Sequence, residues 1–220
     1  DTFTRPLQIK GPLKVLVLSD AHVPYHDETV LEKAIRHGVD AKCEAVYMNG
    51  DMIDCYALSR WQKDPRERDF KRECDTTREV LGEFARHFER RWYKFGNHES
   101  RHEIYVNENA PELVGFKECE LRNILKLDEL GYAYIEDKQW AELGRLPILH
   151  GHEFGKGLTA PVNPARGLWN RTFSTGMVGH LHRSSSNTQK MSIEGNVIAC
   201  WSLGCTCNLR PKYAVVNQWT

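Results

Sequence analysis

Short apolar runs alternate with amphipathic stretches along the first half of the chain. Runs of apolar and β-branched residues that end in polar residues predict buried strands over residues 13–20, 43–51 and 91–99. Apolar residues at helical spacing predict helices over residues 28–38, with Gly38 as the stop signal, and 69–91. Strands that alternate with helices predict right-handed crossovers and a buried sheet.

The second half has a different pattern. Residues 100–131 are polar and helix-like, and closely spaced strand-like segments follow at 131–137, 138–143 and 145–153. Residues 155–172 are rich in Gly, Pro and Asn, which is typical of loops. Further strands are predicted over residues 187–204, joined by a turn at Glu194-Gly195-Asn196, and over 213–220. The pattern predicts an α/β (α+β layered) fold over residues 1–220 as a single domain, with sheets flanked by helices.

Composition narrows the function classes. A chain of 220 residues is long enough to bury a core of its own. Thirty basic and thirty acidic residues give a formal net charge of zero, without the basic face of a protein that tracks long DNA or RNA. We find no run of about 18 apolar residues and no signal-peptide pattern, so we expect no membrane partner and a cytoplasmic location.

Seven cysteines are scattered along the chain, an odd number that is typical of reduced thiols in a cytosol. Cys205 and Cys207, together with Cys200, could bind a metal ion, but no second cysteine pair completes a zinc site. Buried thiols are the preferred interpretation, and the role of these three cysteines stays open.

Potential metal ligands follow each predicted strand. The successive strand ends carry Asp20 and His22, Asp51 and Asp54, Asn97 and His98, His150 and His152, and His180 and His182. Ligands gather at the carboxyl ends of strands in open α/β sheets, so we expect these side chains to converge. Carboxylate, amide and imidazole donors suit a divalent transition metal such as Mn or Fe(II), and their number exceeds what one four-coordinate ion needs. Two ions with a bridging carboxylate would use them all.

Five motifs carry a resemblance to a known family. They are "DAH" (20–22), "GDMID" (50–54), "GNHE" (96–99), "LHGH" (149–152) and "GHLH" (179–182). In this order and at these strand ends, the motifs resemble those of the calcineurin-like metallophosphoesterases, and they span nearly the whole chain. The resemblance implies a four-layer β-sandwich flanked by helices and a dinuclear metal centre.

The resemblance also implies a role for each residue. Asp20, His22 and His182 would hold one ion, Asp51 would bridge, and the second ion would be held by Asn97, His150 and His180. The two divalent ions would be Mn in the first instance, with Fe, Zn, Ni or Mg as alternatives. Hydrolysis would then proceed by metal-activated hydroxide.

His98 corresponds to the family's catalytic histidine, and Asp54 would orient it. In the family's H-G-H segment the first histidine is normally the ligand, which favours His150 over His152. Two alternatives to a catalytic metal centre stay open. The strand-end polar residues could bind no metal, or the protein could be a binding scaffold without catalytic activity.

The substrate is a separate question. Protein Ser/Thr phosphatases of this superfamily carry an arginine after the second motif, where this chain has Cys55. That departure favours the phosphodiesterase and nuclease branch of phages and bacteria over a phosphomonoesterase or protein phosphatase, which is kept as the alternative. We expect a nucleotide or short nucleic acid as substrate, in the cytoplasm of a bacterium or a phage-infected host; a homodimer is compatible with the sequence.

Several candidate substrate contacts lie near the motifs in the sequence. A guanidinium binds phosphate oxygens and an indole stacks on a base, which makes Arg101, Arg166 and Trp169 candidates. The segment 57–72, which contains Trp61, could face the substrate or form a solvated loop. Trp169 could equally be a core residue.

Overall fold

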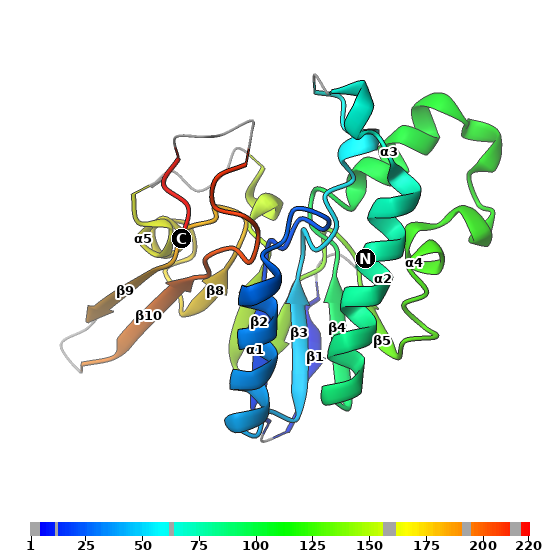
Figure 1. The fold of residues 1–220 in the computed structure, drawn as a ribbon. Coiled ribbons are helices and arrows are strands. Elements are labelled where there is room, and N and C mark those ends of the chain that lie inside the picture. Colours follow the sequence, from blue (N-terminus) through cyan, green and yellow to red (C-terminus); the bar gives the residue numbers. More distant parts are fainter. Residues whose placement is uncertain (1–4, 12, 62–63, 156–161, 191–194, 212–216) are drawn as a thin grey trace.

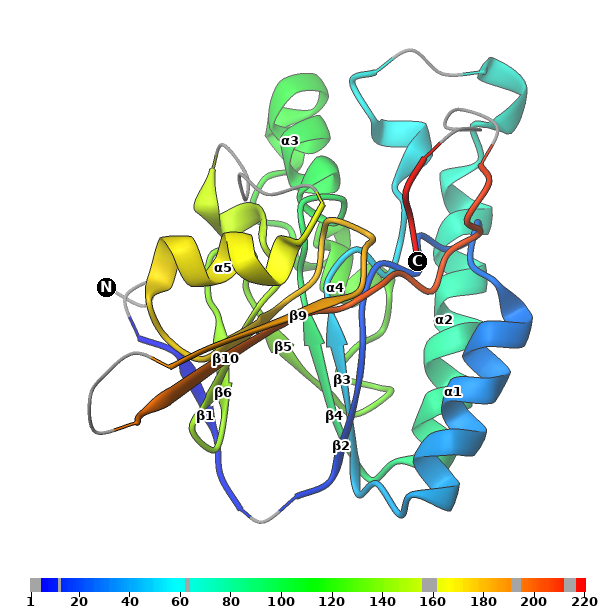
Figure 2. The ribbon, with the colours of Figure 1, turned by 90° about the vertical axis from the view of Figure 1, so that its left-hand side faces the viewer.

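The computed structural model describes residues 5–11, 13–61, 64–155, 162–190, 195–211 and 217–220. Two β-sheets, one of four strands and one of six, lie between helices (Figures 1 and 2). The predicted α/β class, with sheets flanked by helices, is confirmed. None of the described helices combines the length and apolar character needed to cross a lipid bilayer.

The four-stranded sheet is parallel throughout and follows chain order. Its strands are β2 (Val15–Leu18), β3 (Ala45–Asn49), β4 (Arg90–Lys94) and β5 (Tyr132–Ile135). The crossovers contain α1 (Glu28–Asp40), α2 (Phe70–His87), α3 (Ser100–Asn109) and α4 (Leu121–Ile124). Every residue of β3 is buried, as expected for a central parallel strand covered on both faces. The predicted strands and helices of this half are confirmed.

The six-stranded sheet has the order β1-β6-β7-β8-β10-β9. Its strands are β1 (Leu7–Ile9), β6 (Ala141–Leu143), β7 (Leu146–Leu149), β8 (Gly176–Val178), β9 (Ser185–Lys190) and β10 (Val197–Ser202). Strands β9 and β10 pair antiparallel, as the sequence predicts. Of the predicted turn between them, Gly195 and Asn196 are described, whereas Glu194 lies outside the described residues.

Three hydrophobic clusters hold the layers together. Helices α1, α2 and α4 pack on one face of the four-stranded sheet through residues such as Leu31, Leu81 and Phe84. The other face, with Tyr47 and Trp92, meets Ile148 and further residues of the six-stranded sheet. Helix α5 (Pro164–Thr172) covers β8 and β10 with a smaller cluster. Figure 2 shows α1 and α2 at one side of the molecule and α5 at the other.

Several sequence-based boundaries were wrong. Helix α1 does not stop at Gly38 but continues to Asp40, because Gly38 provides close packing: a Cβ there would lie 2.7 Å from the ring of Phe88. Helix α5 was expected as a loop, although Asn163 accepts a hydrogen bond from the Arg166 backbone N–H at its start. Strand β1 was not predicted. Residues 217–220 form no strand, and 212–216 of the predicted last strand lie outside the described residues.

Candidate metal centre

Five loops bring the predicted ligands to one place. Those after β2, β3 and β4 come from neighbouring parallel strands, and those after β7 and β8 come from the adjoining strands of the other sheet. Three overlapping groups have possible ligand atoms within 4.8 Å of one another: Asp20, His22 and His182; His22, Asp51 and His98; and Asp51, His150 and His180. The expected convergence is therefore seen for these seven residues, with Asp51 shared by two groups.

Several buried polar atoms at this place have no hydrogen-bond partner. They are Asp20 Oδ1, Asn97 Oδ1, His150 Nε2, His180 Nδ1 and His182 Nδ1. Each belongs to a residue predicted as a ligand. A buried polar atom without a partner costs about 1–3 kcal/mol, and a cation bound among these five would satisfy them. The set of carboxylate, amide and imidazole donors fits divalent cations.

The hydrogen bonds of His150 and His22 determine which ring nitrogen of each residue faces the other proposed ligands. His150 Nδ1 lies 2.7 Å from the carbonyl oxygen of Asn49, so this nitrogen donates. Its Nε2 is then left to face Asp51 Oδ2 at 3.2 Å. In the same way His22 Nδ1 lies 3.1 Å from Asp54 Oδ2, and its Nε2 lies 3.0 Å from His182 Nε2. Nitrogen and oxygen atoms at these distances can share either a proton or a bound cation.

The carboxylates here remain ionised. Burial raises the pKa of Asp51, but the charges of His150 and His98 outweigh it and hold that pKa well below its usual range. Burial also raises the pKa of Asp20, yet the adjacent His182, whose Nε2 lies 3.3 Å from Asp20 Oδ1, and neighbouring histidine charges lower it to about 2. For His150, burial lowers the pKa, and the charge of Asp51 raises it to about 10. The ionised carboxylates therefore supply negative charge that a histidine proton or a bound cation can neutralise.

The backbone is strained at the same residues. Nine described non-glycine residues have positive φ, and five of them are Asp20, His22, Asp51, His180 and His182. Such conformations persist only where surrounding contacts enforce them, and they cluster at functional sites. Here the His22 N–H donates to the Asp51 carbonyl at 2.9 Å, and the His180 N–H donates to Asp20 Oδ2 at 2.9 Å.

Glu99 fixes two of the loops to each other, a role that sequence reasoning missed. Its buried carboxylate accepts hydrogen bonds from the N–H groups of Asp51, Met52 and Gly96 at 2.9–3.0 Å. Gly50, at φ 89°, lets the second loop pass close to His150, since a Cβ would lie 2.6 Å from His150 Nδ1. The final glutamate of "GNHE" was the available signal for this role.

His98 lies beside the ligands in a defined orientation. Its Nδ1 donates to the backbone carbonyl of Asp54 at 2.9 Å, and its Nε2 accepts from Arg101 Nη2 at 2.8 Å. The Asp54 carboxylate lies closer to His22 Nδ1, at 3.1 Å, than to His98 Nδ1, at 3.6 Å. Asp54 thus contacts His98 through its main chain and His22 through its side chain. That its carboxylate orients His98 stays a prediction.

A cavity of about 510 Å³ opens over the cluster. Its lining includes His98, Arg101, Trp61 and Trp219. Trp61 is exposed, and the Trp219 ring lies 4.3 Å from the His182 ring, centroid to centroid. Trp61 lies in a segment considered as substrate-facing from sequence, whereas Trp219 belongs to no motif and gave no signal.

The other predicted substrate contacts lie elsewhere. Arg166 and Trp169, both on α5, are not among the described residues that line this cavity. Arg166 is exposed, and Trp169 packs against the small cluster under α5 and edge-on against Phe173. Of the three, Arg101 is the one that the structure brings to the cavity.

His152 lies next to the cluster but outside the ligand groups of the described residues. Its ring centroid is 5.2 Å from that of His150 and 6.5 Å from that of His180. Both of its nitrogens are buried without a hydrogen-bond partner. Burial lowers its pKa to about 4, so the ring is neutral. The position of His150, rather than His152, against Asp51 fits the predicted choice of ligand.

Comparison with known proteins finds similarity to phage proteins and names no activity. No family model matches the chain. The Gene 54 protein of Mycobacterium phage L5 is 24% identical over 197 residues, which cover 86% of this chain and 77% of that protein. The Gene 54 protein of Mycobacterium phage D29 is 23% identical over 197 residues, with the same coverage. This chain is therefore similar to two mycobacteriophage proteins whose names state no chemistry.

Proposed function

We propose that the protein is a dinuclear-metal phosphoesterase that hydrolyses phosphodiester bonds of nucleotides or nucleic-acid ends. One observation carries the proposal: Asp51 belongs to two groups of possible ligand atoms, and five predicted ligands each have a buried polar atom without a hydrogen-bond partner. The five motifs support a calcineurin-like metallophosphoesterase, and we assign the two sheets and flanking helices to its four-layer β-sandwich.

The ligands divide between two ions. Asp20, His22 and His182 would hold one, Asn97, His150 and His180 the other, and Asp51 would bridge. Oxygen donors mixed with imidazoles favour Mn²⁺, with Fe, Zn, Ni and Mg as the other ions to test. Two bound divalent ions supply stabilisation of phosphoryl charge and a water of lowered pKa.

His98 and Arg101 act on the phosphoryl group from beside the ligands. The proton of His98 Nδ1 is held on the Asp54 carbonyl, which directs Nε2 into the cavity. A proton on Nε2 would be donated to the departing oxygen, as a general acid does. Arg101, now 2.8 Å from that nitrogen, would then hold a phosphoryl oxygen.

The lining of the cavity favours a diester with a base. A reacting diester phosphate carries one negative charge and a monoester two, so a monoesterase benefits from an additional cation. Cys55, fully buried, stands where the phosphatases have their arginine, which leaves Arg101 as the guanidinium in the lining. Trp61 and Trp219 offer indole faces on which a nucleobase can stack. The alternative is a phosphomonoesterase or protein phosphatase.

The similarity to mycobacteriophage proteins supports a place of action. We propose the cytoplasm of a phage-infected bacterium, which agrees with the cysteine content and with the absence of a membrane-spanning helix among the described residues. The zero net charge favours short substrates over long nucleic acid.

The test is a substrate panel with the metal-stripped protein reconstituted with Mn²⁺. We expect a higher kcat/KM for bis-p-nitrophenyl phosphate than for p-nitrophenyl phosphate, with cyclic nucleotides and DNA as natural candidates. His98→Ala is the control for contaminating hydrolases. Faster hydrolysis of the monoester would favour the phosphatase, and no hydrolysis with any of the five metals would refute the proposal.

A further inference from the structure

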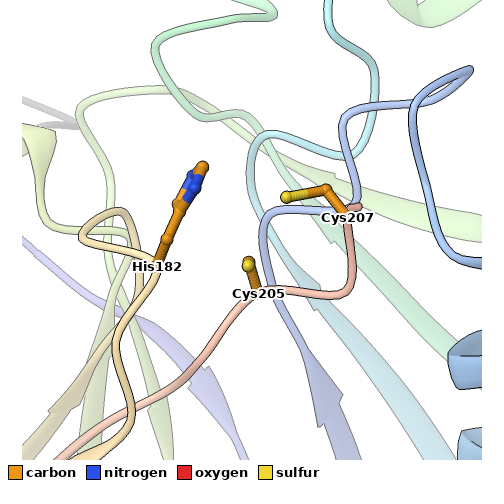
Figure 3. A group of neighbouring side chains, drawn as sticks. All are labelled: His182, Cys205 and Cys207. Carbon is orange, nitrogen blue, oxygen red and sulfur yellow. The ribbon is translucent and has the colours of Figure 1, made fainter. Parts of the chain in front are cut away.

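A second group of possible ligands shares His182 with the first, while its two cysteines play no part in the proposed hydrolysis. Cys205, Cys207 and His182 have ligand atoms within 4.8 Å of one another. Figure 3 shows the three side chains reaching into a common space from two loops, one that follows β8 and one that follows β10.

The loop with the two cysteines is fixed on both sides. The Cys205 N–H donates to the Thr220 carbonyl at 2.9 Å, and the Thr206 N–H lies 3.2 Å from the Asp20 carbonyl oxygen. The Asn208 N–H donates to the backbone carbonyl of Tyr25 at 2.8 Å. These bonds hold the i and i+2 sulfurs beside His182 before any ligand arrives, which lowers the cost of binding.

These thiols differ from the structural cysteines of the chain. Cys55 and Cys74 belong to the cluster under α1 and α2, and Cys200 belongs to the cluster under α5. Cys205 and Cys207 belong to none of the three hydrophobic clusters of the described residues. Apolar packing therefore does not account for them.

His182 has one ring nitrogen to spare. Its Nε2 faces His22 Nε2 at 3.0 Å and Asp20 Oδ1 at 3.3 Å, within the first ligand group. Its Nδ1 is buried and has no hydrogen-bond partner. A metal-bound histidine normally gives its second ring nitrogen to a carboxylate, carbonyl or water. Here that nitrogen is the one that the first ligand group leaves unengaged.

We propose that Cys205, Cys207 and His182 bind a thiophilic divalent cation, with Zn²⁺ as the type, beside the oxygen- and nitrogen-rich centre. Two thiolates and an imidazole leave one position of a tetrahedral ion open to water or a substrate oxygen. Both thiol protons and the Nδ1 proton of His182 leave as the ion binds. A hard ion such as Mn²⁺ is not retained by the sulfurs.

The experiment uses the full chain, reduced and stripped of metal. Titration with Co²⁺ should produce thiolate-to-cobalt charge-transfer absorption in the near ultraviolet, which Zn²⁺ abolishes and Mn²⁺ does not. The double variant Cys205→Ser/Cys207→Ser should lose this absorption and bind one equivalent of Co²⁺ fewer. Cys119→Ser, which removes a cysteine outside the described ligand groups, should behave as wild type.

A measurement on the unaltered protein guards against a misfolded variant. Zn²⁺, but not Mn²⁺, should protect two thiols from modification by Ellman's reagent. The proposal is overturned by the absence of thiolate absorption at saturating Co²⁺, by an unchanged metal content in the double variant, or by two thiols already lost to a disulfide. Because Mn²⁺-dependent hydrolysis is scored separately, its failure alone would refute the phosphoesterase and leave this site standing.

Discussion

The two halves of the molecule contribute different chemistry to the candidate centre. The four-stranded half (β2–β5 with α1–α4) supplies the carboxylates, which belong to Asp20, Asp51 and Asp54, together with His22, Asn97 and the catalytic candidate His98. The six-stranded half (β1 and β6–β10 with α5) supplies His150, His180 and His182, together with the two thiols. The group of Asp51, His150 and His180 contains residues from both halves, and so does the group of Asp20, His22 and His182. The centre therefore exists only when the sheets are packed together, and ions bound there would stabilise that packing.

The largest effect is expected where the two halves meet at Asp51. Asp51→Asn keeps the size of the side chain but removes the charge that His150 and His22 face. We expect loss of metal from both groups and a fall in kcat of ~10³-fold or more. Metal content by mass spectrometry and turnover of bis-p-nitrophenyl phosphate measure the two effects. Retention of both ions would mean that Asp51 does not bridge.

A smaller effect on kcat is expected for His98, which lies in the four-stranded half beside the proposed ligands but is not one of them. His98→Ala should lower kcat by ~10²-fold or more, the usual weight of a positioned acid, while the metal content stays unchanged. The paired measurement separates catalysis from binding. An empty centre in this variant would make His98 a ligand and would contradict its assignment.

Two tryptophans, one from each half, give a matched pair. Trp61→Ala should raise the KM for nucleotide substrates ~10-fold, because it removes an indole from the cavity lining, and should spare bis-p-nitrophenyl phosphate. Trp169→Ala should lower the melting temperature and leave KM unchanged, since this ring packs under α5. If Trp169→Ala raised the KM and Trp61→Ala did not, the substrate would bind at α5, as the sequence-based choice of Arg166 and Trp169 predicts.

The smallest effect concerns stability and pH. The buried carboxylate of Glu73 accepts hydrogen bonds from the N–H groups of Tyr56 and Ala57, just beyond the second ligand loop. Burial raises its pKa from 4.5 to about 7, despite these hydrogen bonds. The folded-state pKa thus lies above the unfolded one, so this group's contribution is complete below pH 4.5 and is lost as pH rises through about 7.

Relative to Glu73→Gln, the wild type should therefore lose on the order of 1–2 kcal/mol of unfolding free energy between pH 5 and pH 8. Urea unfolding at both pH values measures the difference. Glu142→Gln, in β6, is the matched control from the other half. A pH-independent difference between wild type and the Glu73 variant would show that this carboxyl does not titrate in that range.

The two halves were also unequally predictable. In the four-stranded half, buried strands and amphipathic helices match their local patterns, so periodicity located β2, β3, β4 and α2. In the six-stranded half, β1 has three residues and its partner β6 lies 134 positions away, so nothing local marks it. Helix α5 carried its capping signal in Asn163 and Pro164, but the surrounding glycines outweighed it.

For the candidate site, spacing identified the proposed ligands because each follows a strand. Spacing could not identify the residues that contact and orient the proposed ligands. The bonds of Glu99, the contact of Arg101 with His98, and Trp219 against His182 depend on residues that approach only after the loops fold. The substrate contacts assigned to Arg166 and Trp169 came from residue type alone, and residue type does not say which way a helix faces.

The left-handed backbone at Asp20, His22, Asp51, His180 and His182 has a consequence for how this centre should be mutated. Alanine disfavours that conformation by about 1–2 kcal/mol, whereas glycine and asparagine adopt it readily. An alanine scan would thus add a folding defect to each lost ligand and exaggerate every residue's apparent importance. Glycine replacements remove the donor and preserve the path of the chain, so they report on coordination with little added strain. Asparagine in place of an aspartate also preserves that path, but it keeps an oxygen that can still bind metal.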